Sequence, residues 1–259
     1  MYIFEMQFIP REGVHIGDDA NMLTSKISWF LLLCRHSGQS LGYQIRCEDK
    51  PFSYFVYAPE VDALEEKNDA PYVARDRAQL KEYFDISLTL LDSGSKKCAC
   101  SARIGIEMRT DRDQGEGPFV CLSCGRTIPL YRLPAFEGGG FDDTLNWQDA
   151  FAAMLALNNT VMYDEFTSDQ LLRYDSKLNE EGRRLAKKLG QQVDAPVYYR
   201  LYEIDETFKQ QPRQNVDGIF VRICPCCGKT MERLPIAEGE TIEVCKACGL
   251  SSAEEVLEW

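Results

Sequence analysis

The spacing of the cysteines constrains this chain more than any other feature of its sequence. Near the C-terminus, the pairs Cys224-Pro-Cys-Cys227-Gly and Cys245-Lys-Ala-Cys248-Gly stand 17 residues apart. Zn²⁺ prefers four sulfur ligands in a tetrahedron, and each CxxCG turn offers two thiolates to one ion. The residues between the pairs include ERLPIAEGETIEV, which suits the hairpin of a zinc ribbon. The sequence therefore predicts a structural four-cysteine zinc site here.

A second set of cysteines, Cys98-Ala-Cys100 and Cys121-Leu-Ser-Cys124-Gly, has 20 residues between its halves. The CxC half is less usual for a ribbon, so the alternative is a degenerate ribbon whose cysteines are simply buried. No histidine lies nearby to compete as a ligand. We expect a second Zn²⁺ at this site. Both sites would use four protein ligands and leave no open coordination position, which is typical of structural rather than catalytic zinc.

The three remaining cysteines are predicted not to bind metal. Cys226 lies inside a knuckle but outside its two-residue spacing, and Cys34 and Cys47 fall in a predicted helix and strand as inert core thiols. The chain opens without the pattern of a signal peptide, and 11 cysteines is an odd number for a disulfide framework. We therefore expect a cytoplasmic protein with reduced thiols. No apolar run approaches the ~18–20 residues of a membrane span, so no membrane association is expected.

The N-terminal 95 residues alternate between strand and helix patterns. Strands are predicted at 2–9, 41–47, 52–58 and 86–91, and helices at 19–36 and from Pro71 onward. In the first helix, Asp18 or Asp19 would cap the start, Met22 and Leu23 would share its buried face, and Gly38 would end it. The β-α-β-β-α-β order predicts a ferredoxin-like domain over residues 1–95. Because that fold hosts many functions, it indicates none in particular.

The rest of the chain is predicted to be an α+β region stapled by the zinc sites. We divide it into a first zinc-ribbon-like segment (96–134), a helical region with one strand (135–218), and a C-terminal zinc ribbon with its tail (219–259). The helical region contains helices at 144–163 and 179–192 and a strand at 197–204. CGRT with RLP at 124–134 is echoed by CGKT with RLP at 227–235, which indicates two zinc knuckles of one type.

Catalytic signatures are missing from the sequence. It contains no P-loop, dinucleotide fingerprint, G-x-S-x-G elbow or zinc-deaminase pattern. Its two histidines are His15 and His36, and His36 closes a predicted helix, where it complements the helix dipole. We therefore expect a protein that is not an enzyme.

Two surfaces are candidates for binding. Tyr198, Arg200 and Tyr202 would share one face of the strand at 197–204, and such a face can stack nucleobases. The alternative is half-buried sheet packing. Helix 179–192 carries a basic stripe that would meet phosphates, or else a solvated face paired with acidic side chains such as Glu180. The stripe consists of Arg183, Arg184, Lys187 and Lys188.

The formal net charge is −12 and is unevenly distributed. Residues 96–134 carry seven basic and four acidic side chains, whereas residues 1–95 and 135–221 each carry nine basic and fifteen acidic ones. Each four-thiolate zinc site adds a formal −2, which takes the chain to about −16 and segment 96–134 to about +1. A strongly acidic chain repels polyphosphates and favours a basic partner.

Several strings in the second half resemble a bacterial family of zinc-ribbon proteins of unknown function that has been associated with nucleic-acid binding. They are CACS at 98–101, CLSCGRTIPLYRLP at 121–134, NWQDA at 146–150, SKLNEEGRRL at 176–185, PVYYRLY at 196–202 and the closing CPCCG and CKACGL. The resemblance covers roughly residues 96–251 and implies that the zinc ligands are Cys98, Cys100, Cys121, Cys124, Cys224, Cys227, Cys245 and Cys248. It implies no enzymatic activity.

The charge and the zinc sites together suggest two functions. In the first, a non-enzymatic zinc-ribbon protein binds a basic protein partner through acidic surface, for example as an inhibitor or immunity protein against a toxin. In the second, a zinc-ribbon protein binds nucleic acid through residues 96–134 and the Tyr198/Arg200/Tyr202 face.

Overall fold

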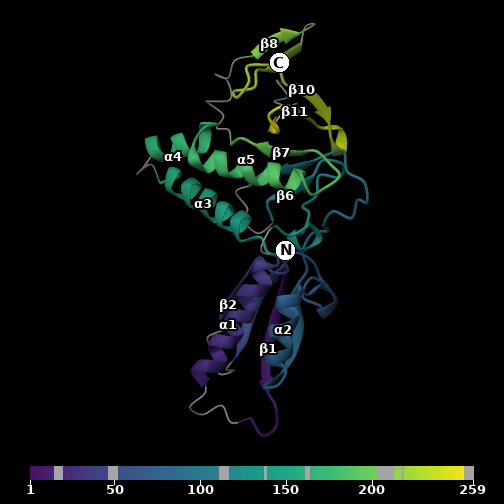
Figure 1. Cartoon of the computed structure of the whole chain (residues 1–259), viewed down its shortest axis with the longest axis vertical. Coiled ribbons are helices and arrows are strands. Elements are labelled where there is room, and N and C mark those ends of the chain that lie inside the picture. The colour runs from purple at the N-terminus through teal and green to yellow at the C-terminus, as the bar shows by residue number, and fades with distance from the viewer. Residues whose placement is uncertain are drawn as a thin grey trace. The chain divides into compact units, whose positions relative to one another are not determined.

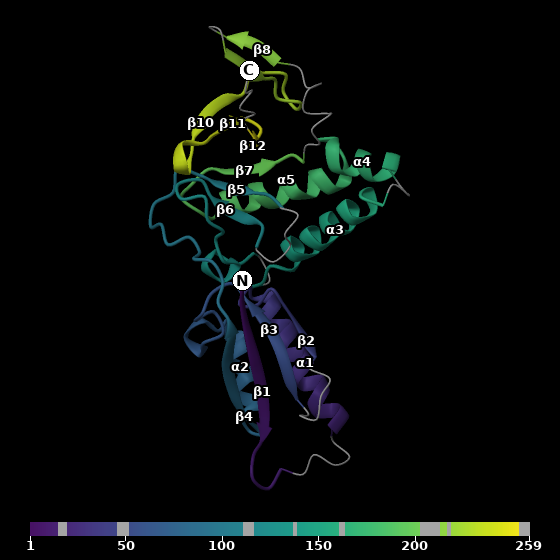
Figure 2. The ribbon, with the colours of Figure 1, turned by 180° about the vertical axis from the view of Figure 1, so that it is seen from behind.

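The computed structural model describes residues 1–14, 20–45, 52–110, 117–136, 139–160, 164–202, 213–216 and 219–253, which form a mixed α+β protein (Figures 1 and 2). The chain divides into two compact units. Unit 1 comprises Met1–Lys97, Gly115–Gly117 and Pro129–Asp142, and unit 2 comprises Cys98–Gln114, Pro118–Ile128 and Asp143–Trp259. This division differs from the predicted one, because Pro129–Asp142 belongs with the N-terminal residues.

Unit 1 contains an antiparallel sheet in the order β2-β3-β1-β4. Its elements follow one another in the predicted β-α-β-β-α-β order. They are β1 (Tyr2–Pro10), α1 (Ala20–His36), β2 (Gly42–Ile45), β3 (Ser53–Ala58), η1 (Glu66–Asn68), α2 (Pro71–Leu80) and β4 (Phe84–Asp92), with η2 (Leu130–Arg132) added from later in the chain. Residues 48–51, which join two of the predicted strands, lie outside the described residues, as do Cys47, His15 and the Asp18 or Asp19 cap.

Helices α1 and α2 lie side by side along the sheet (Figure 1). Alternate residues of β1, among them Phe4, Met6 and Phe8, pack with the buried stripe of α1 in one hydrophobic core. The prediction for α1 was wrong at Met22, which is 45% exposed while Leu23 is buried. Met22 precedes Leu23 by one residue, which is about 100° around the helix, so it lies outside the buried stripe.

The C-terminal end of α1 shows why a glycine is needed there. Gly38 has φ +78° and its N–H donates to the Arg35 carbonyl oxygen at 2.9 Å, as the predicted cap requires. A Cβ on Gly38 would lie 2.3 Å from Leu130 Cβ, so only glycine lets η2 approach this closely. Helix α2 begins at Pro71, as predicted.

Unit 2 joins both cysteine-bearing segments in one six-stranded sheet, in the order β10-β11-β12-β7-β5-β6. The central strand β7 runs parallel to β12 on one side and to β5 on the other. The strands are β5 (Ile106–Met108), β6 (Phe119–Cys121), β7 (Val197–Arg200), β10 (Glu232–Pro235), β11 (Thr241–Cys245) and β12 (Leu250–Ala253). A separate two-stranded sheet consists of β8 (Arg213–Val216) and β9 (Ile219–Arg222), and η3 (Ala237–Gly239) precedes β11. The two segments predicted as separate ribbons are therefore parts of one sheet.

The described residues of this half of the chain include the helices α3 (Asp142–Asn158), α4 (Asp164–Leu172) and α5 (Lys177–Gly190). Helix α5 lies along β7 in both views (Figures 1 and 2). Ser176 caps α5 by accepting a hydrogen bond from the Asn179 N–H at 3.2 Å, and Leu185 and Leu189 are buried against the sheet side. A Cβ on Gly182 would lie 2.2 Å from the Tyr199 ring, so this glycine lets helix and strand pack closely.

The sequence missed some boundaries in unit 2. Helix α3 ends at Asn158 rather than 163, α4 was not predicted, and β7 ends at Arg200 rather than 204. Residues 161–163 and 203–204 lie outside the described part of the chain. Within that part, no helix combines the length and apolarity needed to cross a membrane.

Candidate metal centres

Two groups of four cysteines meet in unit 2, and they are the groups predicted from the sequence. The first contains Cys98, Cys100, Cys121 and Cys124, and the second contains Cys224, Cys227, Cys245 and Cys248. Within each group the four sulfur atoms all lie within 4.8 Å of one another. The CxC half of the first group therefore joins the CxxC half, although the two stand 20 residues apart in sequence.

The sulfur geometry fits a tetrahedral ion. With Zn–S bonds of about 2.3 Å, ideal tetrahedral sulfurs lie about 3.8 Å apart. The Sγ atoms of Cys227 and Cys245 are 3.6 Å apart, and no pair in either group exceeds 4.8 Å. Four thiols and no carboxylate or imidazole form a soft donor set that suits Zn²⁺. Either group could therefore bind a metal ion with all four cysteines.

The backbone forms the same turn at each CxxCG sequence. Gly125, Gly228 and Gly249 have φ values of +66°, +70° and +64°. Each glycine N–H donates to the carbonyl oxygen of the first cysteine of its pair, at 2.8–2.9 Å. A left-handed glycine therefore closes every knuckle and points both thiols toward one centre.

The two similar strings, CGRT with RLP and CGKT with RLP, adopt the same structure over only part of their length. Cys121 and Cys224 donate their N–H groups to Arg126 and Lys229 carbonyl oxygens at 2.9 and 2.8 Å, so the two knuckles match. The following RLP strings differ, because the first adjoins the 3₁₀ helix η2 in unit 1 whereas the second forms β10 in unit 2. The repeat is therefore confined to the knuckle.

Neighbouring thiols ionise in competition with one another. Burial opposes ionisation of Cys98, but hydrogen bonds from the Cys100 N–H and other groups lower its pKa to about 7. The N–H of Lys229 similarly lowers the pKa of Cys227 to about 7. Burial raises the pKa of Cys124 to about 12. A divalent cation at the centre would remove this competition by binding all four as thiolates.

The comparisons with known proteins cover this part of the chain. Residues 105–202 match the domain of unknown function DUF2310. The match runs from the residue before β5 to just beyond β7, so it includes Cys121 and Cys124 but not the second cysteine group. The description of DUF2310 names no metal, ligand or activity.

Two Haemophilus influenzae proteins, both described as uncharacterized, are similar to this chain. One is 26% identical over 242 residues, which is 88% of each chain, and the other is 27% identical over 103 residues, 39% of this chain and 47% of its own. Among solved structures, Rv0793 from Mycobacterium tuberculosis aligns with 37% of this chain and 96% of its own at 17% identity, but its TM-score of 0.28 carries no argument. DUF2310 and these bacterial relatives agree with the resemblance to a family of unknown function, whereas the zinc-ribbon interpretation depends on the cysteine geometry.

A buried carboxylate links three strands of the six-stranded sheet, of which β5 and β7 lie within the DUF2310 match. Glu107 on β5 is fully buried. Its Oε1 accepts hydrogen bonds from Arg200 Nε on β7 at 2.9 Å and from Ser251 Oγ on β12 at 2.7 Å. Arg109 lies 3.5 Å from Oε2. This network could not be predicted from the sequence, because its members come from strands far apart along the chain.

The predicted stacking face is not exposed. Tyr198 is 3% exposed and packs with Leu122, Ile242 and Val244. Arg200 is paired with Glu107, and Tyr202 follows the end of β7 with its ring 5.8 Å from that of Phe151. Leu122, Ile242 and Val244 pack on the Tyr198 side of β7. Sheet packing, the alternative interpretation, therefore describes these residues better than a platform for nucleobases.

The basic stripe of α5 is partly neutralised. Arg184 is ion-paired with Glu181 at 2.6 Å and with Asp143 at 3.1 Å, and the Arg183 guanidinium lies 5.5 Å from the centre of the Tyr174 ring. A groove of about 670 Å³ lies between this stripe and the last knuckle. Its charged lining consists of Glu180, Arg183, Arg184, Lys187 and Lys246, and Cys248 also borders it.

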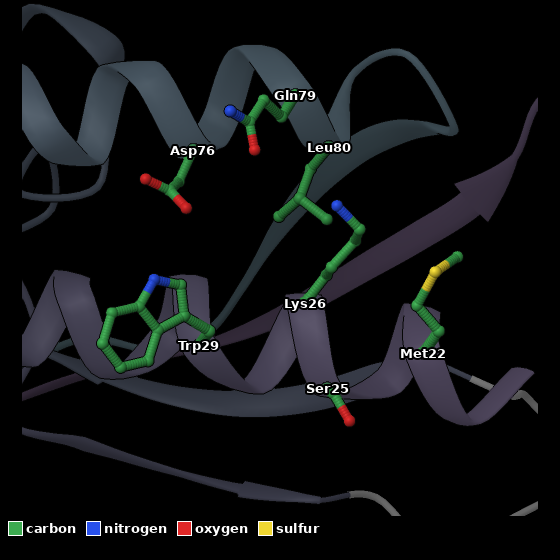
Figure 3. Close-up of a pocket in the computed structure, with 7 residues that line it drawn as sticks. All are labelled: Met22, Ser25, Lys26, Trp29, Asp76, Gln79 and Leu80. Atoms are coloured by element: carbon green, nitrogen blue, oxygen red, sulfur yellow. The ribbon is translucent and has the colours of Figure 1, made fainter.

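Unit 1 has a smaller and more apolar groove between α1 and α2, of about 310 Å³ (Figure 3). Met22, Trp29 and Leu80 provide its apolar lining. The Trp29 indole on α1 and the Asp76 carboxylate on α2 lie on facing sides of the groove (Figure 3). Trp29 is 54% exposed, which is unusual for so large a side chain.

The other predicted residues fall outside both centres. Cys34 is buried in the core of unit 1, and burial raises its pKa to about 12, in agreement with an inert thiol. Cys226 is exposed. His36 Nδ1 pairs with Asp142 at the end of α1, and no described nucleophile is hydrogen-bonded to the ring.

Proposed function

We propose that this protein is a non-enzymatic cytoplasmic binding protein, held together by two structural zinc ions, that docks a basic protein partner. An inhibitor or immunity protein that shields the basic surface of a toxin is one form of this function. The order β2-β3-β1-β4 also supports a ferredoxin-like fold for unit 1. The zinc proposal is supported by the two groups of four close thiols, since four-cysteine zinc sites are structural.

The proposal depends on one observation, namely that basic side chains of this chain are paired with its own carboxylates. Many basic side chains of the described residues face carboxylates of the same chain. These pairs include Arg77–Asp69 and Arg222–Glu243, which are buried, and Arg132–Glu60, Arg184–Glu181 and Arg200–Glu107, which are partly exposed. Cations used inside the fold are not offered to phosphates, so the surplus of acidic groups faces a partner.

Segment 96–134 has the net positive charge that would favour nucleic acid, but its basic side chains are also used within the fold. Lys97 is 5% exposed, Arg109 lies beside Glu107, and the Arg103 side chain is near enough to Cys98 to favour its thiolate. A protein that binds phosphates needs basic side chains in solution, because affinity follows the number of phosphates neutralised. The formal charge of this segment therefore overstates its attraction for nucleic acid.

The groove of unit 1 suits one part of a basic partner, namely an arginine or lysine beside an apolar residue. Its exposed Trp29 offers a ring face for a cation, and Asp76 offers a carboxylate. Asp76 is paired with Arg75, but Arg75 is 68% exposed and such pairs contribute only about 0–1 kcal/mol. Lys26 also lines the groove, and its ammonium lies 5.8 Å from the centre of the Tyr83 ring. A partner cation can therefore replace Arg75 at Asp76.

The groove beside α5 is the observation that favours nucleic acid as a second candidate. Its lining carries four basic side chains and one carboxylate. However, Arg184 and Lys246 already pair with acidic groups, and a filled zinc site at Cys248 would bring a formal −2 to the same groove. The remaining positive charge is small, so we rank this candidate second.

Purification from the native host under mild conditions tests the choice between partners. We expect a basic protein to be captured at low salt and released at high salt, because charge complementarity is screened by ions. The same preparation should not retard single- or double-stranded DNA or RNA at low salt. Capture of nucleic acid without a basic protein would refute the proposal.

Two variants test the docking groove, and a third variant, at a residue as exposed as Trp29, is the control. Trp29→Ser should reduce capture of the basic partner at least tenfold, and Asp76→Asn should reduce its dependence on salt. Phe166→Ser is the control, because Phe166 on α4 is 55% exposed, as Trp29 is 54% exposed, yet lies in unit 2. Equal capture by the Trp29 and Phe166 variants would exclude the groove.

Metal analysis tests the zinc sites directly. The chain should hold two zinc ions, and a Cys224→Ser/Cys227→Ser variant should hold one and lose structure locally. A stoichiometry of one in the unmodified chain would remove the site that uses the CxC sequence.

A further inference from the structure

The two matching knuckles differ at both positions between their cysteines, and one of these differences gives the second knuckle a further thiol that the zinc sites do not use. Cys121-Leu-Ser-Cys124-Gly and Cys224-Pro-Cys-Cys227-Gly superpose in their backbone hydrogen bonds, with isolated bridges Val120–Thr127 and Ile223–Thr230 at equivalent places. The third residue is Ser123 in the first knuckle and Cys226 in the second. The first centre therefore has four thiols and the second has a fifth beside it.

The two residues have different surroundings. Ser123 Oγ accepts a hydrogen bond from the Ile104 N–H at 2.9 Å, so it supports the chain of the first knuckle. Cys226 is exposed, and its thiol lies near that of Cys248, whose pKa is raised by burial and by Cys226 and other neighbouring thiols. Cys226 is not among the four cysteines whose sulfurs all lie within 4.8 Å of one another. Its thiol therefore lies outside the group of four but beside one member of it.

The second centre is also the more open one. Cys227 is exposed and Cys248 is half-buried at the edge of the α5 groove. In the first centre, Cys98 and Cys121 are buried and the other two cysteines are half-buried. A small oxidant can reach the Cys226–Cys248 pair from solvent.

We propose that Cys226 is a resolving thiol: hydrogen peroxide converts Cys226 and Cys248 to a disulfide, so that the second centre loses a zinc ligand while the first does not. This inference rests on the proposed zinc binding. The C-terminal centre would then release and rebind zinc reversibly in response to peroxide. The first centre has Ser123 in place of a fifth thiol, so it would keep its zinc.

The chemistry balances with peroxide as the only oxidant. The Cys248 thiolate attacks one peroxide oxygen, so an S–O bond forms, the O–O bond breaks and hydroxide leaves. The Cys226 thiol then attacks the Cys248 sulfur of the sulfenic acid, so the S–S bond forms and water leaves. The hydroxide takes a proton from solvent to give the second water. Two thiols have lost two electrons, and a dithiol reductant restores them.

The experiment uses the full chain with two zinc ions bound and no free reductant. Peroxide is added, zinc release is followed with a chromogenic chelator, and disulfides are mapped by mass spectrometry of non-reduced peptides. We expect one of the two ions to be released, a Cys226–Cys248 disulfide to form, and dithiothreitol to restore zinc binding. Cys226→Ser should bind two zinc ions before treatment and release them at least tenfold more slowly.

The matched gain-of-function variant is Ser123→Cys, which gives the first knuckle a fifth thiol. We expect peroxide then to release zinc from both centres. Equal release from the unmodified chain and Cys226→Ser would overturn the inference, as would a disulfide formed only among the four ligands. Fewer than two zinc ions before peroxide would instead refute the proposed zinc binding, so the two failures are distinguishable.

Discussion

The buried carboxylate of Glu107 provides the sharpest test of how unit 2 holds its two cysteine segments together. Glu107→Gln keeps the shape of the side chain and removes its charge. Oε1 accepts from Arg200 and Ser251 at 2.9 and 2.7 Å, and Arg109 lies at 3.5 Å from the other oxygen. The substitution leaves two arginines beside a neutral amide.

The expected loss follows from burial. Removing one partner of a fully buried ion pair costs about 3–5 kcal/mol. Here the carboxylate is buried, but the Arg200 and Arg109 side chains remain 22% and 25% exposed, so water can solvate part of their charge. The amide oxygen can still accept one hydrogen bond. We therefore expect the free energy of unfolding of unit 2 to fall by about 2–3 kcal/mol.

Urea unfolding followed by tryptophan fluorescence measures this loss. A Trp29→Phe/Trp259→Phe background leaves Trp147, which is 3% exposed in unit 2, as the single tryptophan of the chain. Zinc is kept in excess in every sample, because metal that binds the folded state adds to its stability. With a urea slope of about 1–3 kcal/mol per molar, a loss of about 2–3 kcal/mol should lower the midpoint by roughly 0.7–3 M.

The control is Arg184→Gln, which breaks the exposed ion pair between Arg184 and Glu181, whose side chains are 49% and 41% exposed. This change should alter the free energy of unfolding by about 0–1 kcal/mol. A Glu107→Gln/Arg200→Gln double variant should lose less than the sum of its single variants, because the two side chains interact. If Glu107→Gln changes stability no more than the control does, the carboxylate does not hold the three strands together.

Three further outcomes are expected. Gly182→Ala should destabilise unit 2 by about 1–2 kcal/mol in the same assay, because overpacking against the Tyr199 ring outweighs the better helix propensity of alanine. Gly190→Ala is the control: a Cβ there would have its nearest neighbour 3.6 Å away, so the change should be neutral or stabilising. Burial raises the pKa of Cys34 from 9.0 to about 12, so the folded chain keeps a proton that the unfolded chain releases. Stability of unit 1 should therefore decline between pH 9 and 12, and Cys34→Ala should abolish that part of the slope, which a series of urea curves will show. A strong chelator should lower the midpoint for unit 2 and leave the melting of unit 1 unchanged, as circular dichroism can follow; equal loss in both units would contradict zinc sites confined to unit 2.

Regular elements of unit 1 could be predicted because their signals are local. Pro71 at a helix start, Gly38 after a helix end and the alternating residues of β1 each depend on a few neighbouring residues. Helix α4 was missed because its nine residues show no clear apolar stripe, and β7 was predicted too long because its pattern continues past the last paired residue, Arg200.

The binding surfaces were harder to predict than the elements. The pattern of Tyr198 and Arg200 shows that they share one face of a strand, but not whether that face is covered. β5 and β12 flank β7, and residues of β11 pack on Tyr198 from far along the chain. The Trp29 groove was missed for the opposite reason, because α1 buries a different stripe and leaves Met22 and Trp29 outside.

The members of the two ligand sets could be predicted from local spacing, because a CxxCG turn depends on two cysteines a few residues apart and on a glycine that can adopt positive φ. That Cys98 and Cys100 meet Cys121 and Cys124, that β7 joins both segments through Glu107, and that Cys226 lies near Cys248 became evident in the folded chain alone. Those relations depend on strand pairing and burial between residues far apart in sequence. The free energy of such contacts comes from the folded arrangement as a whole, and no local pattern records it.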